Sequence, residues 1–378
     1  MNNTLNIAMF GHKRIPSREG GIEVVVEELS TRMVKCGHKV CCYNRKGQHV
    51  SGAEFKCETK DDYKGITIKN VFTIDKKGLA AVTSSFFASI LSAIGKYNVV
   101  HIHAEGPAAF CWLPKLFGKK VIVTVHGLDH QRAKWGKLAT AYIMLGEKCA
   151  AKYADEIIVL SQSVQDYFRE VYHRETVLIP TGVEPGELRA AEQITREFGL
   201  ESRGYLLFLG RIVPEKGLRY LVEAYRQVET SLPLVIAGGS SDTEEFLQEL
   251  KELAGQDSRI RFVGFVQGKL LQELYSNAYL YVLPSDLEGM PLSLLEAMSF
   301  GNCCLTSDIP ECTQVVEDRG VTFRQGDTED LREKLQMLCR DPELVEGYRR
   351  DAASFICGKY NWNDVTAQTL ALYEKNGK

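Results

Sequence analysis

The sequence predicts an α/β protein with two doubly wound, Rossmann-like domains that face each other across a cleft. Short apolar runs alternate with segments of helical periodicity along almost the whole chain, which is the pattern of a parallel sheet covered by helices on both faces. A polar stretch around Pro185 and Gly186 interrupts this alternation, which then restarts. The 378 residues are enough for two separate hydrophobic cores.

The first domain is predicted to cover residues 1–185. Its apolar runs predict strands at 5–11, 39–44, 66–72, 98–103, 121–126, 156–161 and 176–179. Its periodic segments predict helices at 22–36, 79–95, 107–116, 134–153 and 163–171. Residues 186–200 are polar and are predicted to form the linker to the second domain.

The second domain is predicted to cover residues 201–358, and a final segment, 359–378, to hold one more helix at 363–374. The strands expected in this domain are 205–210, 234–239, 260–265, 280–283 and 303–306. Helices are expected to begin near residues 217, 243, 268 and 291, with two later ones at 328–339 and 342–356.

Composition excludes several classes of protein. A formal charge of −3 gives no basis for nucleic-acid binding, which needs a concentrated basic face. The 11 cysteines are scattered without C-x-x-C pairs, which favours reduced thiols in a cytoplasmic protein over a disulfide framework or a zinc site. The first residues lack the basic region and apolar core of a signal peptide.

Residues 79–95 have two interpretations. The segment is uncharged, is flanked by Lys76, Lys77 and Lys96, and contains five Ser or Thr residues. It falls short of the roughly 20 strongly apolar residues that a membrane span needs. We favour a buried crossover helix, and the alternative is a helix that touches the membrane surface and holds the protein at the inner face of the cell membrane.

Two loops that follow expected strands carry groups suited to an anion. In the first, four cationic or potentially cationic residues, His12 among them, precede Gly20 and Gly21 at a helix start, where backbone N–H groups and the helix dipole favour negative charge. In the second, Arg211 and Lys216 could converge on a diphosphate. The alternatives are a flexible Gly-containing loop and two solvated cations.

A third loop places His126 at the end of an apolar strand, pointing into the cleft. A satisfied, half-buried histidine is the alternative, and the neighbouring His101 and His103 are assigned no role. The sequence has no H-E-x-x-H or D-x-D spacing, no dinucleotide fingerprint and no Walker A loop, so we predict no metal site and no cofactor.

The fourth loop, 285–296, contains two carboxylates around a helix start. Glu288 lies in a Gly-containing turn after a buried strand, Pro291 is expected at the first helical position, and Glu296 lies inside the helix. Three backbone N–H groups between the carboxylates are expected to be free: Gly289, Met290 and Leu292. Ordinary turn chemistry and a solvated helix face are the alternatives.

Taken together, these motifs resemble those of the family 4 glycosyltransferases of the GT-B fold, over essentially the whole chain. The resemblance rests on the E-x7-E pair Glu288 and Glu296, Gly210-Arg211…Lys216-Gly217, Gly20-Gly21 and His126-Gly127. Residues 15–23 further resemble the N-terminal motif of bacterial members that build cell-surface polysaccharides, including rhamnosyltransferases.

The resemblance implies a role for each residue. Arg211 and Lys216 would hold the donor diphosphate beside the Gly20-Gly21 loop, and Glu296 the ribose. Glu288 would bind hydroxyls of the transferred sugar, and His126 would lie near the reacting carbon. Four neighbours would complete the donor site: Gly289, Met290, Pro291 and Leu292. Many relatives have Asp directly after this histidine, where this chain has Gly127.

The family would transfer sugar with retention of configuration and without a metal, and its last helix would return to the first domain. We therefore expect a retaining glycosyltransferase of the hexosyltransferase class. Its donor would be a UDP-, GDP- or dTDP-sugar and its acceptor a glycan or lipid-linked saccharide, with acceptor specificity in loops such as 44–64. The alternatives are a sugar-nucleotide epimerase or hydrolase of the same architecture, and a non-catalytic nucleotide-sugar-binding protein.

Overall fold

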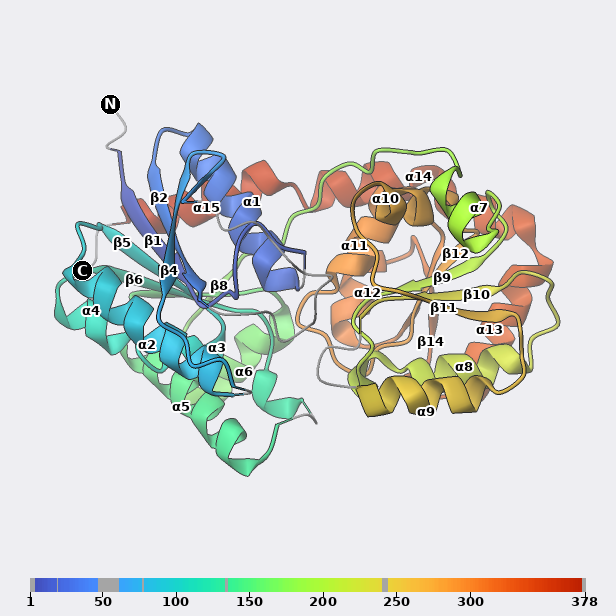
Figure 1. Ribbon diagram of the computed structural model, residues 1–378, viewed down its shortest axis with the longest axis horizontal. Coiled ribbons are helices and arrows are strands. Elements are labelled where there is room, and N and C mark those ends of the chain that lie inside the picture. Colours follow the sequence, from blue (N-terminus) through green and yellow to red (C-terminus); the bar gives the residue numbers. More distant parts are fainter. Residues whose placement is uncertain are drawn as a thin grey trace. The chain divides into compact units, whose positions relative to one another are not determined.

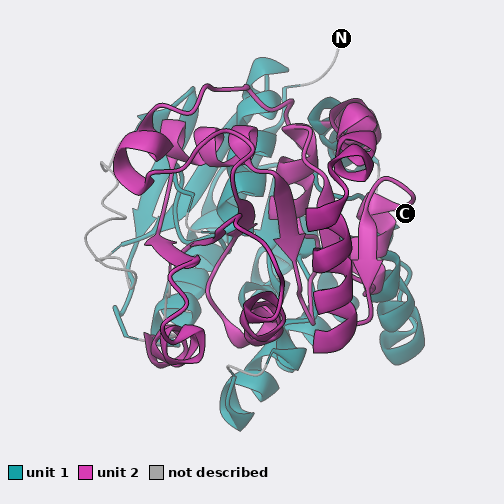
Figure 2. Cartoon of the chain, turned by 90° about the vertical axis from the view of Figure 1, so that its right-hand side faces the viewer, with its two compact units in different colours: residues 1–181, 362–378 teal, residues 182–361 magenta. Residues whose placement is uncertain are grey.

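The computed structural model describes residues 4–18, 20–46, 61–76, 78–132, 135–239 and 244–375. The chain divides into two compact units, which Figure 2 colours separately. Unit 1 comprises Met1–Thr181 and Trp362–Lys378, and unit 2 comprises Gly182–Asn361. Most of the loop 44–64, where we expected acceptor specificity, lies outside the described residues.

Unit 1 contains, in its described part, an eight-stranded sheet in the order β3-β4-β2-β1-β5-β6-β7-β8. The strands are β1 (Asn6–Phe10), β2 (Lys39–Arg45), β3 (Asp62–Tyr63), β4 (Ile66–Val71), β5 (Val99–His103), β6 (Lys120–Val125), β7 (Glu156–Val159) and β8 (Val177–Leu178). All neighbours are parallel except β3 and β4. The predicted parallel sheet is confirmed, and only the two-residue strand β3 was missed.

Helices cover both faces of this sheet (Figure 1). Because side chains alternate along a strand, Ile7 and Met9 contribute to the core cluster that contains residues of α1 (Gly21–Lys35) and α15 (Trp362–Glu374). Ala8 and Phe10 belong to the cluster on the other face. The helices on that face are α2 (Leu79–Ile94), α3 (Glu105–Ala108), α4 (Trp112–Leu116), α5 (Lys137–Tyr153) and α6 (Gln162–Tyr172).

Helix α2 differs from the buried crossover helix that we favoured. The helix forms where it was predicted, but its buried residues are small: Ala80, Ser84, Ser85, Ala88, Ser89, Ser92 and Ala93. The larger Leu79, Phe86, Phe87, Leu91 and Ile94 are exposed. Small side chains allow close packing of α2 on its neighbours. The hydroxyls of Ser84, Ser89 and Ser92 donate to backbone carbonyls, as Ser89 does to Phe110 O at 2.9 Å.

Unit 2 contains, among the residues described, a six-stranded parallel sheet in the order β11-β10-β9-β12-β13-β14. The strands are β9 (Leu206–Leu209), β10 (Leu234–Ala237), β11 (Ile260–Gly264), β12 (Leu280–Leu283), β13 (Cys304–Ser307) and β14 (Val321–Phe323). Helices α8 (Leu218–Arg226), α9 (Glu244–Ala254) and α13 (Thr328–Arg340) cover one face, and α10 (Gly268–Asn277), α11 (Leu292–Ser299) and α14 (Pro342–Lys359) the other (Figure 1). Strand β14 and the short helix α12 (Pro310–Val316) were not predicted.

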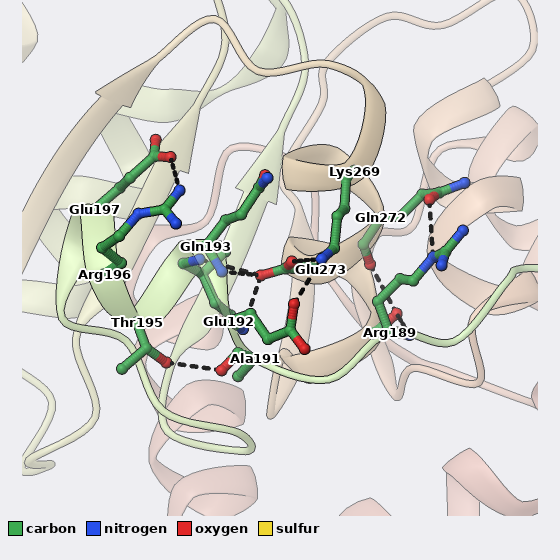
Figure 3. A network of polar contacts seen from close by, with 12 residues as sticks. Arg189, Ala191, Glu192, Gln193, Thr195, Arg196, Glu197, Lys269, Gln272 and Glu273 are labelled. Atoms are coloured by element: carbon green, nitrogen blue, oxygen red, sulfur yellow. Dashed lines mark hydrogen bonds and ion pairs between the residues drawn. The ribbon is translucent and has the colours of Figure 1, made fainter.

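The stretch predicted as a linker, 186–200, is instead folded into unit 2. It contains helix α7 (Gln193–Phe198), whose first N–H groups bond to a buried carboxylate of α10 (Figure 3). Glu273 Oε2 accepts from the backbone N–H groups of Glu192, Gln193 and Ile194 at 3.0, 2.6 and 3.1 Å. Burial alone would raise the pKa of Glu273, but these bonds lower it below its ordinary value. The local sequence gives no capping signal for α7, because Glu273, far along the chain, supplies the cap.

Candidate active site

The second and fourth predicted loops meet at one end of the unit 2 sheet. The loop after β9 closes through a 3-10 turn, Pro214–Lys216, and Gly217 has φ +66°. A Cβ at Gly217 would overlap Pro284 O at the end of β12, so only glycine allows this close approach. The backbone N–H of Asp286 donates to Glu215 O at 2.9 Å. The two loops are therefore held together by backbone contacts.

Lys216 and Glu288 form a direct ion pair at this meeting point. Lys216 Nζ lies 2.5 Å from Glu288 Oε1, and the two side chains are 11% and 8% exposed. Ser285 Oγ donates to the same carboxylate oxygen at 2.6 Å. An ammonium carries three N–H donors, so this pairing fixes Lys216 and leaves it donors for a ligand. Sequence reasoning gave the two residues separate roles and did not predict the pair.

Asp286, Tyr220 and Gln325 support this turn and were missed as site residues. Tyr220 OH donates to Asp286 Oδ2 at 2.5 Å, and Gln325 Nε2 donates to Asp286 O at 3.1 Å. Burial, and then the charge and hydrogen bond of Asp286, raise the pKa of Tyr220 to about 12. Of these three residues, only Asp286 could have been suspected from the sequence, because it is a turn residue next to the E-x7-E motif.

The helix start after Glu288 differs from the prediction in two details. Pro291 is the N-cap of α11 rather than its first residue, and Leu292 N–H donates to Met290 O at 2.9 Å. The Leu292 amide, predicted to be free, is therefore already used, because the chain makes a tight three-residue turn there. Gly289 and Met290 lie in the turn between Glu288 and this cap, as expected from the sequence.

Glu296 and Arg211 are the other two predicted donor-site residues of unit 2. Glu296 lies within α11, is half-buried, and its Oε2 accepts from Tyr275 OH at 3.0 Å. The Tyr275 ring stacks on Phe300 with centroids 5.3 Å apart, which orients the hydroxyl. Glu296 is therefore held in place rather than simply solvated. Arg211 is half-buried and lies two residues after the end of β9, in the same loop as Lys216.

In unit 1, His126 follows strand β6 and is half-buried. Its Nε2 lies 3.1 Å from His103 Nδ1 on the neighbouring strand β5. Gly127, with φ +144°, turns the chain immediately afterwards. Burial lowers the pKa of His126 to about 4, while the charges of Asp129 and Glu23 act in the opposite direction. His126 is therefore a neutral imidazole at pH 7, oriented by a residue to which we had assigned no role.

Three more histidines of unit 1 are buried near His126 and are neutral. Burial lowers the pKa of His12 to about 4, of His101 to about 3, and of His103 well below its usual value. His12 Nε2 lies 3.0 Å from Asn44 Oδ1, and His101 contacts Tyr373 OH and Thr124 Oγ1 at 2.5 and 2.6 Å. His12, counted among the potentially cationic loop residues, thus carries no charge.

The Gly20-Gly21 helix start already has a carboxylate beside it. Gly20 is the N-cap of α1, and Glu23, in the first turn, is 4% exposed. Glu23 Oε1 accepts from the backbone N–H of Lys13 at 2.8 Å, and a Cβ at Gly20 would contact Glu23 Oε2. This negative charge opposes a second anion at the same helix terminus. We therefore expect this loop to bind a phosphate less strongly than the cations of unit 2 do.

A buried polar cluster that the sequence did not indicate lies behind the His126 loop. Glu147 accepts hydrogen bonds from His130 Nδ1, Tyr167 OH and Tyr172 OH at 2.7, 2.9 and 2.8 Å, and Asp129 N–H donates to Glu105 Oε2 at 2.8 Å. Burial, then Asp129 and Glu147, raise the pKa of Glu105 to about 10. One potential metal-ligating atom from each of Glu105, His130 and Glu147 lies within 4.8 Å of the others. Because hydrogen bonds already occupy Glu147, we interpret the cluster as support for the loop.

Comparisons with known proteins identify the family. Residues 19–187 match the model of Glycosyltransferase Family 4, and residues 191–355 match that of Glycosyl transferases group 1. The chain belongs to the glycosyltransferases. It is 25% identical over 299 residues to an alpha-D-kanosaminyltransferase of Streptomyces kanamyceticus, with 74% of this chain and 77% of that protein covered.

Two further comparisons cover nearly the whole glycosyltransferase chain. An alpha-maltose-1-phosphate synthase of Mycolicibacterium smegmatis is 26% identical over 401 residues, covering 98% of this chain and 99% of that protein. Among solved structures, Anabaena HepE in complex with UDP-glucose has a TM-score of 0.80 at 15% identity, covering 97% and 99%. The predicted family and the GT-B fold class are thereby confirmed.

Proposed function

We propose that this glycosyltransferase moves a sugar from a nucleotide-sugar onto a glycan or lipid-linked saccharide, with retention of configuration, in cell-surface polysaccharide synthesis. The observation that carries the proposal is the Lys216–Glu288 pair, held at the meeting of two strand-end loops with Glu296 in the helix that follows. That HepE was solved with UDP-glucose supports a nucleotide-sugar donor, which we propose to be UDP-, GDP- or dTDP-linked.

The proposed donor site divides the nucleotide-sugar among these residues. Arg211 and Lys216 stabilise the negative charge that develops on the leaving diphosphate, so that no metal is required. Glu288 holds Lys216 through one oxygen, and its second oxygen accepts from a hydroxyl of the transferred sugar. Glu296, fixed by Tyr275, accepts from the ribose hydroxyls.

In unit 1, the proposed role of His126 is to bind a sugar hydroxyl. With a pKa of about 4 it has no proton to give as an imidazolium at neutral pH, but a neutral ring can donate or accept one hydrogen bond. We propose that the acceptor attacks on the face from which the diphosphate leaves, and that the departing phosphate takes the acceptor proton. This scheme retains configuration without an enzymic nucleophile.

The subgroup motif at residues 15–23 and the family together support action on a bacterial cell-surface polysaccharide. We further propose a cytoplasmic enzyme that works at the inner face of the cell membrane, where a lipid-linked acceptor would present its saccharide. Among the helices described, none is long and apolar enough to cross a membrane.

The test is product analysis with UDP-, GDP- and dTDP-linked sugars and a lipid-linked saccharide acceptor. We expect acceptor-dependent release of one nucleoside diphosphate and, by NMR, an anomeric configuration equal to that of the donor. Free sugar or an isomer formed without acceptor would indicate a hydrolase or epimerase. Binding without any turnover would indicate a non-catalytic protein, and an inverted product would contradict the retaining mechanism.

A further inference from the structure

Helix α2 presents its large apolar side chains outward. Phe86, Phe87, Leu91 and Ile94 share one helical face and are 39%, 36%, 40% and 65% exposed. The opposite face, which packs on the unit, is made of alanines and serines. An ordinary amphipathic surface helix has the reverse arrangement. We call this face, together with the neighbouring side chains of Phe72 and Trp112, the α2 patch.

The α2 patch continues onto neighbouring elements of unit 1. The ring of Phe72, 57% exposed after β4, lies 5.2 Å from that of Phe87, and the rings of Phe86 and Phe110 lie 5.4 Å apart. Helix α4 packs beside α2 (Figure 1) and exposes 41% of Trp112. A contiguous apolar surface of this kind marks an interaction site rather than scattered surface residues.

The charges around the α2 patch are almost all positive. Residues 76–120 contain six lysines and a single acidic residue, Glu105, which is fully buried. Lys76 and Lys96, at the two ends of α2, are exposed. The acidic residues closest in sequence to this range are Asp75 and Asp129. Asp129 is paired with Arg132, and Asp155, further along the chain, is paired with Lys115. This local excess of lysine stands against a net charge of −3 for the whole chain.

We propose that the α2 patch docks unit 1 onto an anionic lipid surface, with α2 lying in the plane of the interface. Exposed Phe, Leu and Trp side chains enter the boundary between headgroups and acyl chains, and flanking lysines contact anionic headgroups. A second copy of this chain fits less well, because a two-fold contact through this patch would bring the same lysines together. The inference rests on the membrane location given under the proposed function and assigns the surface that makes the contact. Vesicle binding requires no donor or turnover, so its failure is distinguishable from a failure of the transferase activity.

The experiment is flotation of the full chain with vesicles of phosphatidylglycerol and phosphatidylcholine, and with vesicles of phosphatidylcholine alone. We expect binding to the anionic vesicles that weakens as salt is raised. The double variant Phe87→Ser/Leu91→Ser should lose at least about tenfold in partitioning. Its control is Leu188→Ser, which removes a 69% exposed leucine from unit 2 and should bind as the wild type does.

A second pair of variants tests the charges. Lys96→Gln should weaken binding to anionic vesicles about fivefold, whereas Lys251→Gln, an exposed lysine of unit 2, should not. Trp112 emission should shift to the blue on vesicle addition, and Trp112→Phe should remove that shift.

Two outcomes would overturn the proposal. One is vesicle binding that the Phe87→Ser/Leu91→Ser variant leaves intact, which would assign the membrane contact to another surface. The other is the absence of binding to the anionic vesicles; a dimer in sedimentation velocity that this variant dissociates would then assign the α2 patch to contact with a second copy of this chain. Neither outcome would bear on the glycosyltransferase activity, which is measured with soluble donor.

Discussion

Two clusters of buried ionisable groups, one in each unit, differ in charge. In unit 2, Lys216 and Glu288 are nearly buried and are paired at 2.5 Å. In unit 1, His12, His101 and His103 are fully buried, and burial lowers their pKa values until they are neutral. A buried group stays ionised where an oppositely charged partner compensates its lost hydration, and becomes neutral where no such partner is present. The Lys216 cluster of unit 2 is thus suited to a diphosphate, and the histidine cluster of unit 1 to uncharged hydrogen bonding.

Gly217→Ala should have the largest effect, because it disturbs the contact that holds the two loops of the unit 2 site together. The new Cβ would overlap Pro284 O, so we expect a loss of about 3 kcal/mol or more in unfolding free energy and loss of donor binding. The matched control is Gly199→Ala, also in unit 2, with φ +61° but no atom near the added Cβ. It should cost only about 1–2 kcal/mol. Thermal unfolding followed by circular dichroism measures both, and equal losses would refute the close-contact explanation.

Removing either cation tests whether unit 2 carries the diphosphate. Arg211→Ala and Lys216→Ala should each lower kcat/KM roughly 10- to 150-fold, since a hydrogen bond to a charged group is worth about 1.5–3 kcal/mol. Lys269→Ala, an exposed lysine paired with Glu192 and Glu273, serves as the control and should change kcat/KM little. Wild-type kinetics in both Arg211 and Lys216 variants would remove the phosphate assignment.

The neutral histidines of unit 1 predict a pH dependence of stability. The folded pKa of His101, about 3, lies below the unfolded value of 6.5, so the unfolded chain binds more protons and stability falls as pH drops below about 6.5. Between pH 7.5 and 4.5, His101 alone should account for about 2.5 kcal/mol. That part should vanish in His101→Gln. All three tryptophans, Trp112, Trp135 and Trp362, lie in unit 1, so urea titration by fluorescence reports this unit. Identical pH profiles in both proteins would contradict a neutral buried His101.

The smallest expected effect concerns the start of α1. Glu23→Gln keeps an acceptor for Lys13 N–H but removes the negative charge that opposes an anion there. If the diphosphate approaches the Gly20-Gly21 loop, donor affinity should rise about two- to fivefold, corresponding to roughly 0.3–1 kcal/mol. Calorimetric titration measures this. A fall in affinity would show that Glu23 itself assists donor binding.

The sequence predicted the fold well wherever a signal was local. Apolar runs located the strands of both sheets except β3 and β14, which have two and three residues. The linker was misplaced because α7 depends on Glu273, about 80 residues away. Helix α2 was located correctly, yet its burial was inverted, because hydrophobicity alone does not show that serines pack inward.

The residues of the candidate site could be singled out from the sequence, but their contacts could not. Arg211, Lys216 and Glu288 lie in turns after strands, and Glu296, within α11, completes the E-x7-E spacing; their roles in donor binding stay predictions. The pairing of Lys216 with Glu288 joins two loops 72 residues apart, which no single-sequence pattern encodes. The neutral state of the unit 1 histidines depends on burial, and their contacts are equally non-local: His101 lies against Tyr373 of α15, and His12 against Asn44 of β2.

In the proposed donor site, Lys216 binds the diphosphate and Glu288 the sugar of the same donor. Calorimetric titration of wild type, Lys216→Ala and Glu288→Gln, each with the nucleoside diphosphate and with the matching nucleotide-sugar, tests it directly. We predict that Lys216→Ala weakens both ligands at least about tenfold, whereas Glu288→Gln weakens the nucleotide-sugar more than the diphosphate. Unchanged affinities in both variants, or equal weakening of both ligands by Glu288→Gln, would contradict this division of roles.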